Sequence, residues 1–127
     1  MFRKMLKSKI HRATITGADL NYEGSISIDP RLIAAAGLTE YEAVNIWNIT
    51  NGQRFETYVI RGREDSGDIC INGAAARLVS PGDKIIIASF SYYLEEELRK
   101  FMPKVIFVDE DNNIAEIRAE IPGPQIF

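Results

Sequence analysis

A glycine followed by a serine, Gly24 and Ser25 in YEGSISID, has the residue types and order for chemistry on the chain itself. The Ser25 hydroxyl can attack the carbonyl carbon of Gly24 through a five-membered ring, which moves the acyl group from nitrogen to oxygen. Gly24 has no Cβ and tolerates the unusual backbone dihedrals that this attack requires. The ester can then lose its acyl group by β-elimination, and hydrolysis of the dehydroalanine releases ammonia and leaves a pyruvoyl group. The alternative interpretation is an ordinary turn leading into a strand.

The other residues whose side chains could take part in catalysis or bind a metal support fewer conclusions. One histidine, His11, and one cysteine, Cys70, cannot supply a zinc site by themselves, and they allow no disulfide framework. We interpret Cys70, between two isoleucines, as a buried strand thiol. The stretch DEDNNIAEIRAE matches several ligand positions of a calcium loop, but Ile114 stands where that loop requires glycine. The sequence therefore predicts no metal, and a solvated hairpin turn in place of a calcium site.

The segments that would position these residues are rich in β-branched and aromatic side chains. Two such runs flank Asn51-Gly52, which is a strong hairpin signal. In the first strand, the alternation predicts that Lys9, His11, Ala13 and Ile15 share one face. Strands are expected within residues 7–20, 25–29, 42–50, 53–62, 68–71, 84–90 and 104–121.

Helices are expected to be few and short. Asp29 and Pro30 fit the N-cap and first position of a helix PRLIAAA, which Gly37 would end. Thr39 to Glu42 fits a capping box, for one turn only. The stretch 91–102, SYYLEEELRKFM, has the apolar spacing of an amphipathic helix. Six or more strands with so little helix predict a mainly β fold, a small barrel or a sandwich.

Length and charge limit the function classes. A chain of 127 residues is expected to form a single domain, and a net charge of −3 without a basic cluster does not favour nucleic-acid binding. The chain shows no apolar run long enough for a membrane span and no signal-peptide pattern, so a cytoplasmic location without a membrane partner is expected. Several strands are apolar on both faces, which suggests a homo-oligomer whose subunits cover one another.

Five stretches in this order carry a family resemblance: MLKSKIHRATIT, ADLNYEGSISID, NIWNITNGQRFETYVI, INGAAARL and PGDKIIIASF. Together they closely resemble the aspartate 1-decarboxylase family, over roughly residues 1–115. The resemblance implies a double-psi β-barrel with short peripheral helices, assembled as a homotetramer. It also implies cleavage into residues 1–24, the β chain, and 25–127, the α chain with an N-terminal pyruvoyl group derived from Ser25. The implied reaction converts L-aspartate to β-alanine and CO2 for pantothenate and coenzyme A biosynthesis.

The resemblance also implies roles for single residues. Ser25 would become the pyruvoyl group that forms a Schiff base with substrate, and Tyr58 would be the proton donor. Thr57 would assist cleavage at Gly24 and later contact substrate, while Arg54 suits a substrate carboxylate. The remaining expected site residues are Lys9, for positive charge and substrate binding, Gly73, Ala74 and Ala75, for substrate binding, and His11, Tyr22, Trp47 and Asn72, for the pocket.

One conflict and three alternatives remain open. In a regular strand Arg54 and Tyr58 face one way and Thr57 the other, so either the strand bulges or the site lies at a subunit boundary. The competing functions are a non-catalytic double-psi barrel that binds a partner, and a pyruvoyl decarboxylase of another amino acid. Whether cleavage is spontaneous or needs a maturation helper protein is also left open.

Overall fold

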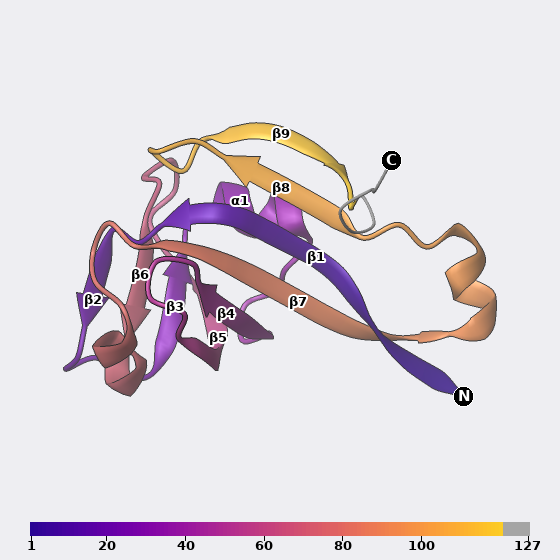
Figure 1. Ribbon diagram of the computed structural model, residues 1–127, viewed down its shortest axis with the longest axis horizontal. Helices are drawn as coiled ribbons and strands as arrows, with labels where there is room; N and C mark the ends of the chain where they lie inside the picture. The colour runs from indigo at the N-terminus through magenta and orange to yellow at the C-terminus, as the bar shows by residue number, and fades with distance from the viewer. Residues whose placement is uncertain (121–127) are drawn as a thin grey trace.

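The computed structural model describes residues 1–120, and the strands in this part of the chain form one curved mixed sheet (Figure 1). Its strand order is β2-β6-β3-β5-β4-β7-β1-β8-β9. The predicted mainly β class is confirmed, and the sheet is consistent with a barrel. The strands are β1 (Phe2–Thr14), β2 (Gly17–Asp19), β3 (Ser25–Ile28), β4 (Ala43–Asn48), β5 (Arg54–Arg61), β6 (Ile69–Asn72), β7 (Lys84–Leu94), β8 (Lys104–Val108) and β9 (Ile114–Ala119).

Isoleucine dominates the core on the concave side of this sheet. The side chains of Ile10, Ile26, Ile46, Ile71 and Ile87 are all at most 1% exposed. Each contributes about 1.5–3 kcal/mol by leaving water. Because the β-branched side chain also suits a pleated strand, the same residues form the strands and fill the space between them.

The face predicted for β1 is wrong beyond His11. Ile10 and Ala13 both point into the core, although they are three residues apart. Between them the register against β7 shifts, and Arg12 adopts a φ of 63°. This β-bulge adds one residue to the strand, so Ala13 and Ile15 lie on the opposite face from Lys9 and His11.

The helix predicted over residues 91–102 is also wrong. β7 continues to Leu94, paired with the start of β1 from Phe2↔Leu94 to Leu6↔Phe90, and only a 3-10 helix, η2 (Glu95–Lys100), follows. Figure 1 shows these two long strands extending side by side to the N-terminus, with η2 at the end of β7. Pairing with β1 therefore overrides the helical spacing of Leu94, Leu98 and Phe101.

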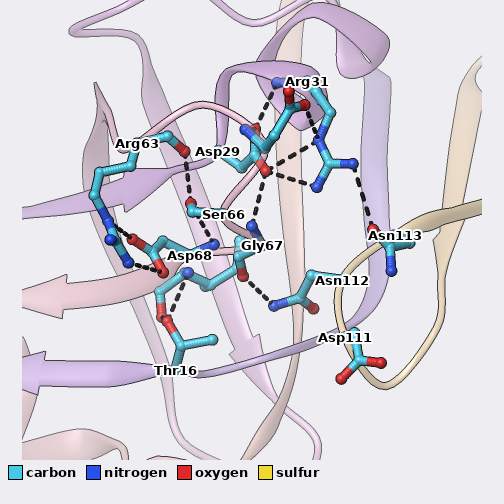
Figure 2. Close-up of polar contacts among 12 residues, drawn as sticks. Thr16, Asp29, Arg31, Arg63, Ser66, Gly67, Asp68, Asp111, Asn112 and Asn113 are labelled. Carbon is cyan, nitrogen blue, oxygen red and sulfur yellow. Dashed lines mark hydrogen bonds and ion pairs between the residues drawn. The ribbon is translucent and has the colours of Figure 1, made fainter.

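The short helix α1 (Pro30–Ala36) forms as predicted, with Asp29 as N-cap and Gly37 in the left-handed conformation at its end. The buried Asp29 carboxylate accepts hydrogen bonds from the backbone N–H groups of Arg31 and Gly67, both at 2.9 Å, and from the Arg31 guanidinium (Figure 2). Burial alone would raise its pKa, but these donors outweigh burial and lower the pKa to about 2. Asp29 thus joins the end of β3 to α1 and to the loop before β6.

Both predicted hairpins are confirmed: β4 pairs with β5 and β8 with β9, each antiparallel. Ile121, the last residue expected in the second hairpin, lies outside the described residues. The capping-box stretch forms a turn without a helix, in which the Thr39 N–H donates to Glu42 Oε1 at 3.0 Å. Besides α1 and η2, the structure has a second 3-10 helix, η1 (Gly73–Leu78). No helix within residues 1–120 is long and apolar enough to cross a membrane.

Candidate active site

Ser25 is the first residue of β3, and its side chain is buried, with 1% of the residue exposed. β3 pairs antiparallel with β6, which places Asn72 directly opposite Ser25. The Asn72 side-chain amide donates to Ser25 Oγ at 2.9 Å, and Ser25 Oγ lies 3.4 Å from the Glu23 carbonyl oxygen. The hydroxyl oxygen is therefore held beside the peptide bond that joins Gly24 to Ser25.

Gly73 allows the backbone of β6 to approach Gly24 closely. A Cβ on Gly73 would lie 2.7 Å from Gly24 Cα and 3.2 Å from the Tyr22 carbonyl oxygen. Gly73 has a φ of +80°, whereas Gly24 is not among the positive-φ glycines. The left-handed glycine at this contact is therefore Gly73. Within η1, Ala74 is exposed and Ala75 is half-buried beyond it.

β5 lies on the other side of β3, in parallel, with Ile26 level with Val59. The same register, continued back by one residue, brings Ser25 level with Tyr58. Tyr58 is on the outer face of β5 and 37% exposed, while the half-buried Thr57 is on the inner face. β4 and β5 pair from Ala43↔Tyr58 to Trp47↔Arg54 without a register shift. No bulge in this register therefore brings Thr57 and Tyr58 to one face of β5.

Arg54 and Trp47 pair with each other four residues from Tyr58, near the β4–β5 turn. The Arg54 guanidinium lies 4.8 Å from the centre of the Trp47 ring, in a cation–π contact. Four strand residues span about 13 Å, so this pair is displaced from Ser25 along the sheet. Arg54 and Tyr58 do share the outer face, as their spacing predicts.

Lys9 and His11 are further away, on β1. Lys9 is opposite Ala88 of β7, and Ala88 is opposite Asn45 of β4, so two strands lie between β1 and β5. The Lys9 ammonium instead forms an ion pair with Glu120 at 3.0 Å. Burial, and then the charge of Lys9, lower the pKa of His11 below its ordinary value, so its imidazole is neutral at pH 7.

Within one chain, the structure thus divides the expected residues into two groups. In the first group, Tyr22, Gly24, Ser25, Asn72 and Gly73 lie at the Gly24–Ser25 bond, Thr57 and Tyr58 lie on the adjacent strand β5, where only Tyr58 shares the face of Ser25, and Ala74 and Ala75 follow Gly73 in the chain. The second group lies on other parts of the sheet and consists of Lys9, His11, Trp47 and Arg54. The first group contains the groups for backbone cleavage, and the second contains the cations.

Comparison with known proteins identifies the family of the chain. A family model for aspartate decarboxylase matches residues 1–115. The chain belongs to the aspartate decarboxylase family. An aspartate 1-decarboxylase of Legionella pneumophila (strain Lens) is 62% identical over 122 residues, which cover 96% of this chain and 92% of that protein. An aspartate 1-decarboxylase of Clostridium botulinum is 60% identical, over 92% of this chain and 94% of that protein. One of Rhodopirellula baltica is 48% identical, over 98% of this chain and 80% of that protein.

Two neighbours of Ser25 are not among the residues that the family motifs indicate. Ser27 Oγ accepts a second hydrogen bond from the Asn72 amide at 3.0 Å, and Cys70 Sγ lies 3.4 Å from Asn72 Oδ1. The prediction for Cys70 is correct as to the strand but wrong as to burial, because the residue is half-buried. Residues two apart on one strand share a face, so the sequence indicates that Ser27 lies on the face of Ser25 and Cys70 on the face of Asn72. It does not indicate that these two faces meet, because that depends on the pairing of β3 with β6.

A cavity of about 420 Å³ lies elsewhere, between the end of α1, β1 and η2. Lys7, Tyr93, Glu97, Lys100 and Met102 are among its lining residues, and none of the expected site residues is. This cavity therefore does not include the Gly24–Ser25 bond. Among residues 1–120, no three His, Cys, Asp or Glu side chains gather in a way that could hold a metal ion.

Proposed function

We propose that this protein is a self-processing decarboxylase that converts L-aspartate to β-alanine and CO2, using a pyruvoyl group made from its own Ser25. The names of its relatives support the reaction. The observation that carries the proposal is the position of Ser25 Oγ, which is buried, held by Asn72, and next to a glycine that another glycine contacts. A serine at the start of an ordinary strand needs none of these features.

The cleavage follows from this geometry in balanced steps. Ser25 Oγ bonds to the Gly24 carbonyl carbon, the C–N bond breaks, and the nitrogen gains a proton, which gives an ester. Loss of the Ser25 α-proton then breaks the Cβ–Oγ bond, so Gly24 ends in a carboxylate and residue 25 becomes dehydroalanine. Addition of water and loss of ammonia leave the pyruvoyl group. The products are residues 1–24 and 25–127, and a donor at Oγ assists the departure of the carboxylate, because negative charge develops on this oxygen as the Cβ–Oγ bond breaks.

The surroundings of Ser25 fit this group. Gly73 and Asn72 keep the backbone and one polar donor close to the reacting residue. When formed, the pyruvoyl ketone supplies an electron sink for loss of CO2 from an amino acid. Tyr58, level with Ser25 and partly exposed, would deliver a proton to the α-carbon after CO2 has left. Thr57 would assist cleavage and contact substrate, and Gly73 to Ala75 would line the substrate site with small groups.

The cations that would bind the substrate carboxylates lie outside this group, and we propose that a second copy of the chain supplies them. A regular β5 keeps Arg54 near Trp47, and Lys9 is on β1. The extended β1–β7 pair exposes Phe2 and Tyr92, at 63% and 68%, which are large apolar side chains for a single chain to leave in water. A homotetramer would cover such surfaces and bring Arg54 or Lys9 of one copy to Ser25 of another.

Intact mass measurement of the purified protein, followed by an assay of β-alanine formation from L-aspartate, tests the proposal. The residue 25–127 chain should be lighter by one ammonia than a plain hydrolysis product, and Ser25→Ala should remain a single folded chain without activity. The protein should be incubated with and without cell extract, which reveals whether a helper protein is required. A single chain after both incubations would favour the non-catalytic barrel, and turnover of another amino acid would change the substrate. A role in pantothenate biosynthesis in the cytoplasm is part of the proposal.

A further inference from the structure

The Asn72 side chain has a partner at each end of its amide. Its Nδ2 donates to Ser25 Oγ at 2.9 Å and to Ser27 Oγ at 3.0 Å, so both amide hydrogens are used. Its Oδ1 lies 3.4 Å from Cys70 Sγ. Ser25 pairs with Asn72 and Ser27 with Cys70 across the antiparallel β3–β6 ladder, so all four side chains lie on one face. Asn72 is 4% exposed, which leaves little room for water to replace these partners.

The orientation of the Asn72 amide determines whether a hydrogen-bond donor or an acceptor faces Ser25 Oγ. With Nδ2 toward Ser25, a donor faces the oxygen that leaves as part of a carboxylate, and it stabilises the negative charge that develops there. With the amide turned over, Oδ1 would face Ser25, and the oxygen would lose that donor. The hydroxyls of Ser25 and Ser27 can each donate or accept, so they do not decide between the two orientations.

The thiol of Cys70 distinguishes between the two orientations of the Asn72 amide. Burial, and then the charges of Asp19 and Asp68, raise the pKa of this thiol, so it keeps its proton at neutral pH. A protonated thiol donates to an amide oxygen better than it accepts from an amide nitrogen. Gly17 of β2 pairs with Cys70 of β6 and leaves space for the thiol. A Cβ on Gly17 would lie 3.3 Å from Cys70 Sγ.

We propose that Cys70 is a positioning residue for self-cleavage, whose thiol fixes the Asn72 amide with its nitrogen toward Ser25 Oγ. This inference rests on the proposed function, because it concerns the rate at which the Gly24–Ser25 bond breaks. Cys70 does not touch the reacting atoms and acts through Asn72 alone. Since Cys70 is the one cysteine of the chain, its replacement leaves no other thiol to take over the contact.

The test follows the conversion of freshly purified single chain into two chains by intact mass, for the unchanged protein, Cys70→Ala and Cys70→Ser. Cys70→Ala removes the donor that fixes the Asn72 amide, so the hydrogen bond from Asn72 Nδ2 to Ser25 Oγ should be lost and cleavage should slow about tenfold. Cys70→Ser retains a donor of similar size at the same place and should cleave at nearly the original rate. A merely structural role would not distinguish the two replacements in this way.

Two further measurements keep the outcomes distinct. The unfolding midpoints of Ser25→Ala and Ser25→Ala/Cys70→Ala should be similar, which separates slow cleavage from poor folding. If Cys70→Ala does not fold, Gly17→Ala, which presses on Sγ without removing it, should slow cleavage in its place. Equal rates for Cys70→Ala and the unchanged protein, or equally slow rates for Cys70→Ala and Cys70→Ser, would overturn the inference. Failure of the unchanged protein to cleave would instead overturn the proposed function.

Discussion

Gly73 and Gly24 contact each other so closely that a Cβ on Gly73 would lie 2.7 Å from Gly24 Cα and 2.8 Å from Gly24 N. No side-chain rotation can relieve such a clash, because both contacting atoms belong to the backbone. A Cβ on Gly24, in contrast, would meet no atom within 4 Å. The requirement for glycine at this contact therefore comes from Gly73, and Gly73 fixes the position of the bond that is proposed to break.

Replacement of Gly73 by alanine should abolish or strongly slow the cleavage. The new Cβ must push the Gly24 backbone away from its position beside Ser25 Oγ, and the left-handed φ adds about 1–2 kcal/mol of strain. Gly52→Ala is a matched control, because Gly52 has the same φ of +80° but open space around it. Both variants should lose stability in urea denaturation, and only Gly73→Ala should lose cleavage measured by intact mass. Equal cleavage in the two variants would contradict this role of the contact.

The elements that the sequence predicted correctly are those specified by neighbouring residues. The Asp29 N-cap, Pro30 and Gly37 define α1 within nine residues, and Asn51-Gly52 defines the β4–β5 hairpin. The two errors depend on partners far away in the chain. Strand alternation alone does not reveal the bulge at Arg12, and the helical spacing of residues 91–102 does not reveal that β1 extends far enough to pair with them.

The buried Asp29 carboxylate should make folding sensitive to acid. Its folded-state pKa of about 2 lies below the ordinary value, so its stabilisation is fully present above about pH 4 and is lost as the pH falls toward 2. The ionised Asp29 contributes about 2 kcal/mol to the free energy of unfolding. Urea denaturation at pH 7, 4 and 2.5 measures this contribution, in the Ser25→Ala variant because it should remain one chain. Asp29→Asn in the same background should be less stable at pH 7, because an amide has one oxygen in place of the two carboxylate oxygens that accept from Arg31 and Gly67. It should also lose less stability than Ser25→Ala between pH 4 and 2.5.

The candidate site was also predictable only in part, because some of its contacts join residues far apart in the chain. YEGS and RFETY indicate the reacting residues directly, because a family motif is a local pattern. The contact between Asn72 and Ser25 depends on the register of β3 against β6, two strands more than 40 residues apart in the chain. The ion pair of Lys9 with Glu120 brings together both ends of the described chain. No local pattern indicates that this lysine is paired within its own chain.

Two inactive variants should restore activity to each other if the site lies between subunits. Arg54→Ala should cleave normally but lose most turnover, since a substrate carboxylate would lose a charge-assisted hydrogen bond worth about 1.5–3 kcal/mol. Ser25→Ala should lack the pyruvoyl group but keep Arg54. When the two chains are produced together, random assortment should leave about a quarter of the sites with both residues intact. Activity of the mixed oligomer no higher than that of Arg54→Ala alone would place Arg54 and Ser25 of the same chain in one site, or remove Arg54 from it.

Tyr58→Phe should separate cleavage from decarboxylation. Phenylalanine keeps the ring on the outer face of β5, level with Ser25, and removes only the phenolic proton. Cleavage is assigned to Ser25, Asn72 and Thr57, so the variant should process fully by intact mass. Its turnover of L-aspartate should fall by about 10²–10⁴-fold, the usual contribution of a positioned general acid. Tyr41→Phe is the matched control, since this tyrosine is 74% exposed, has no assigned role and should keep full turnover. Near-normal β-alanine formation by fully processed Tyr58→Phe would assign the proton to water or to another residue, and the outer face of β5 would then serve the substrate only through Arg54.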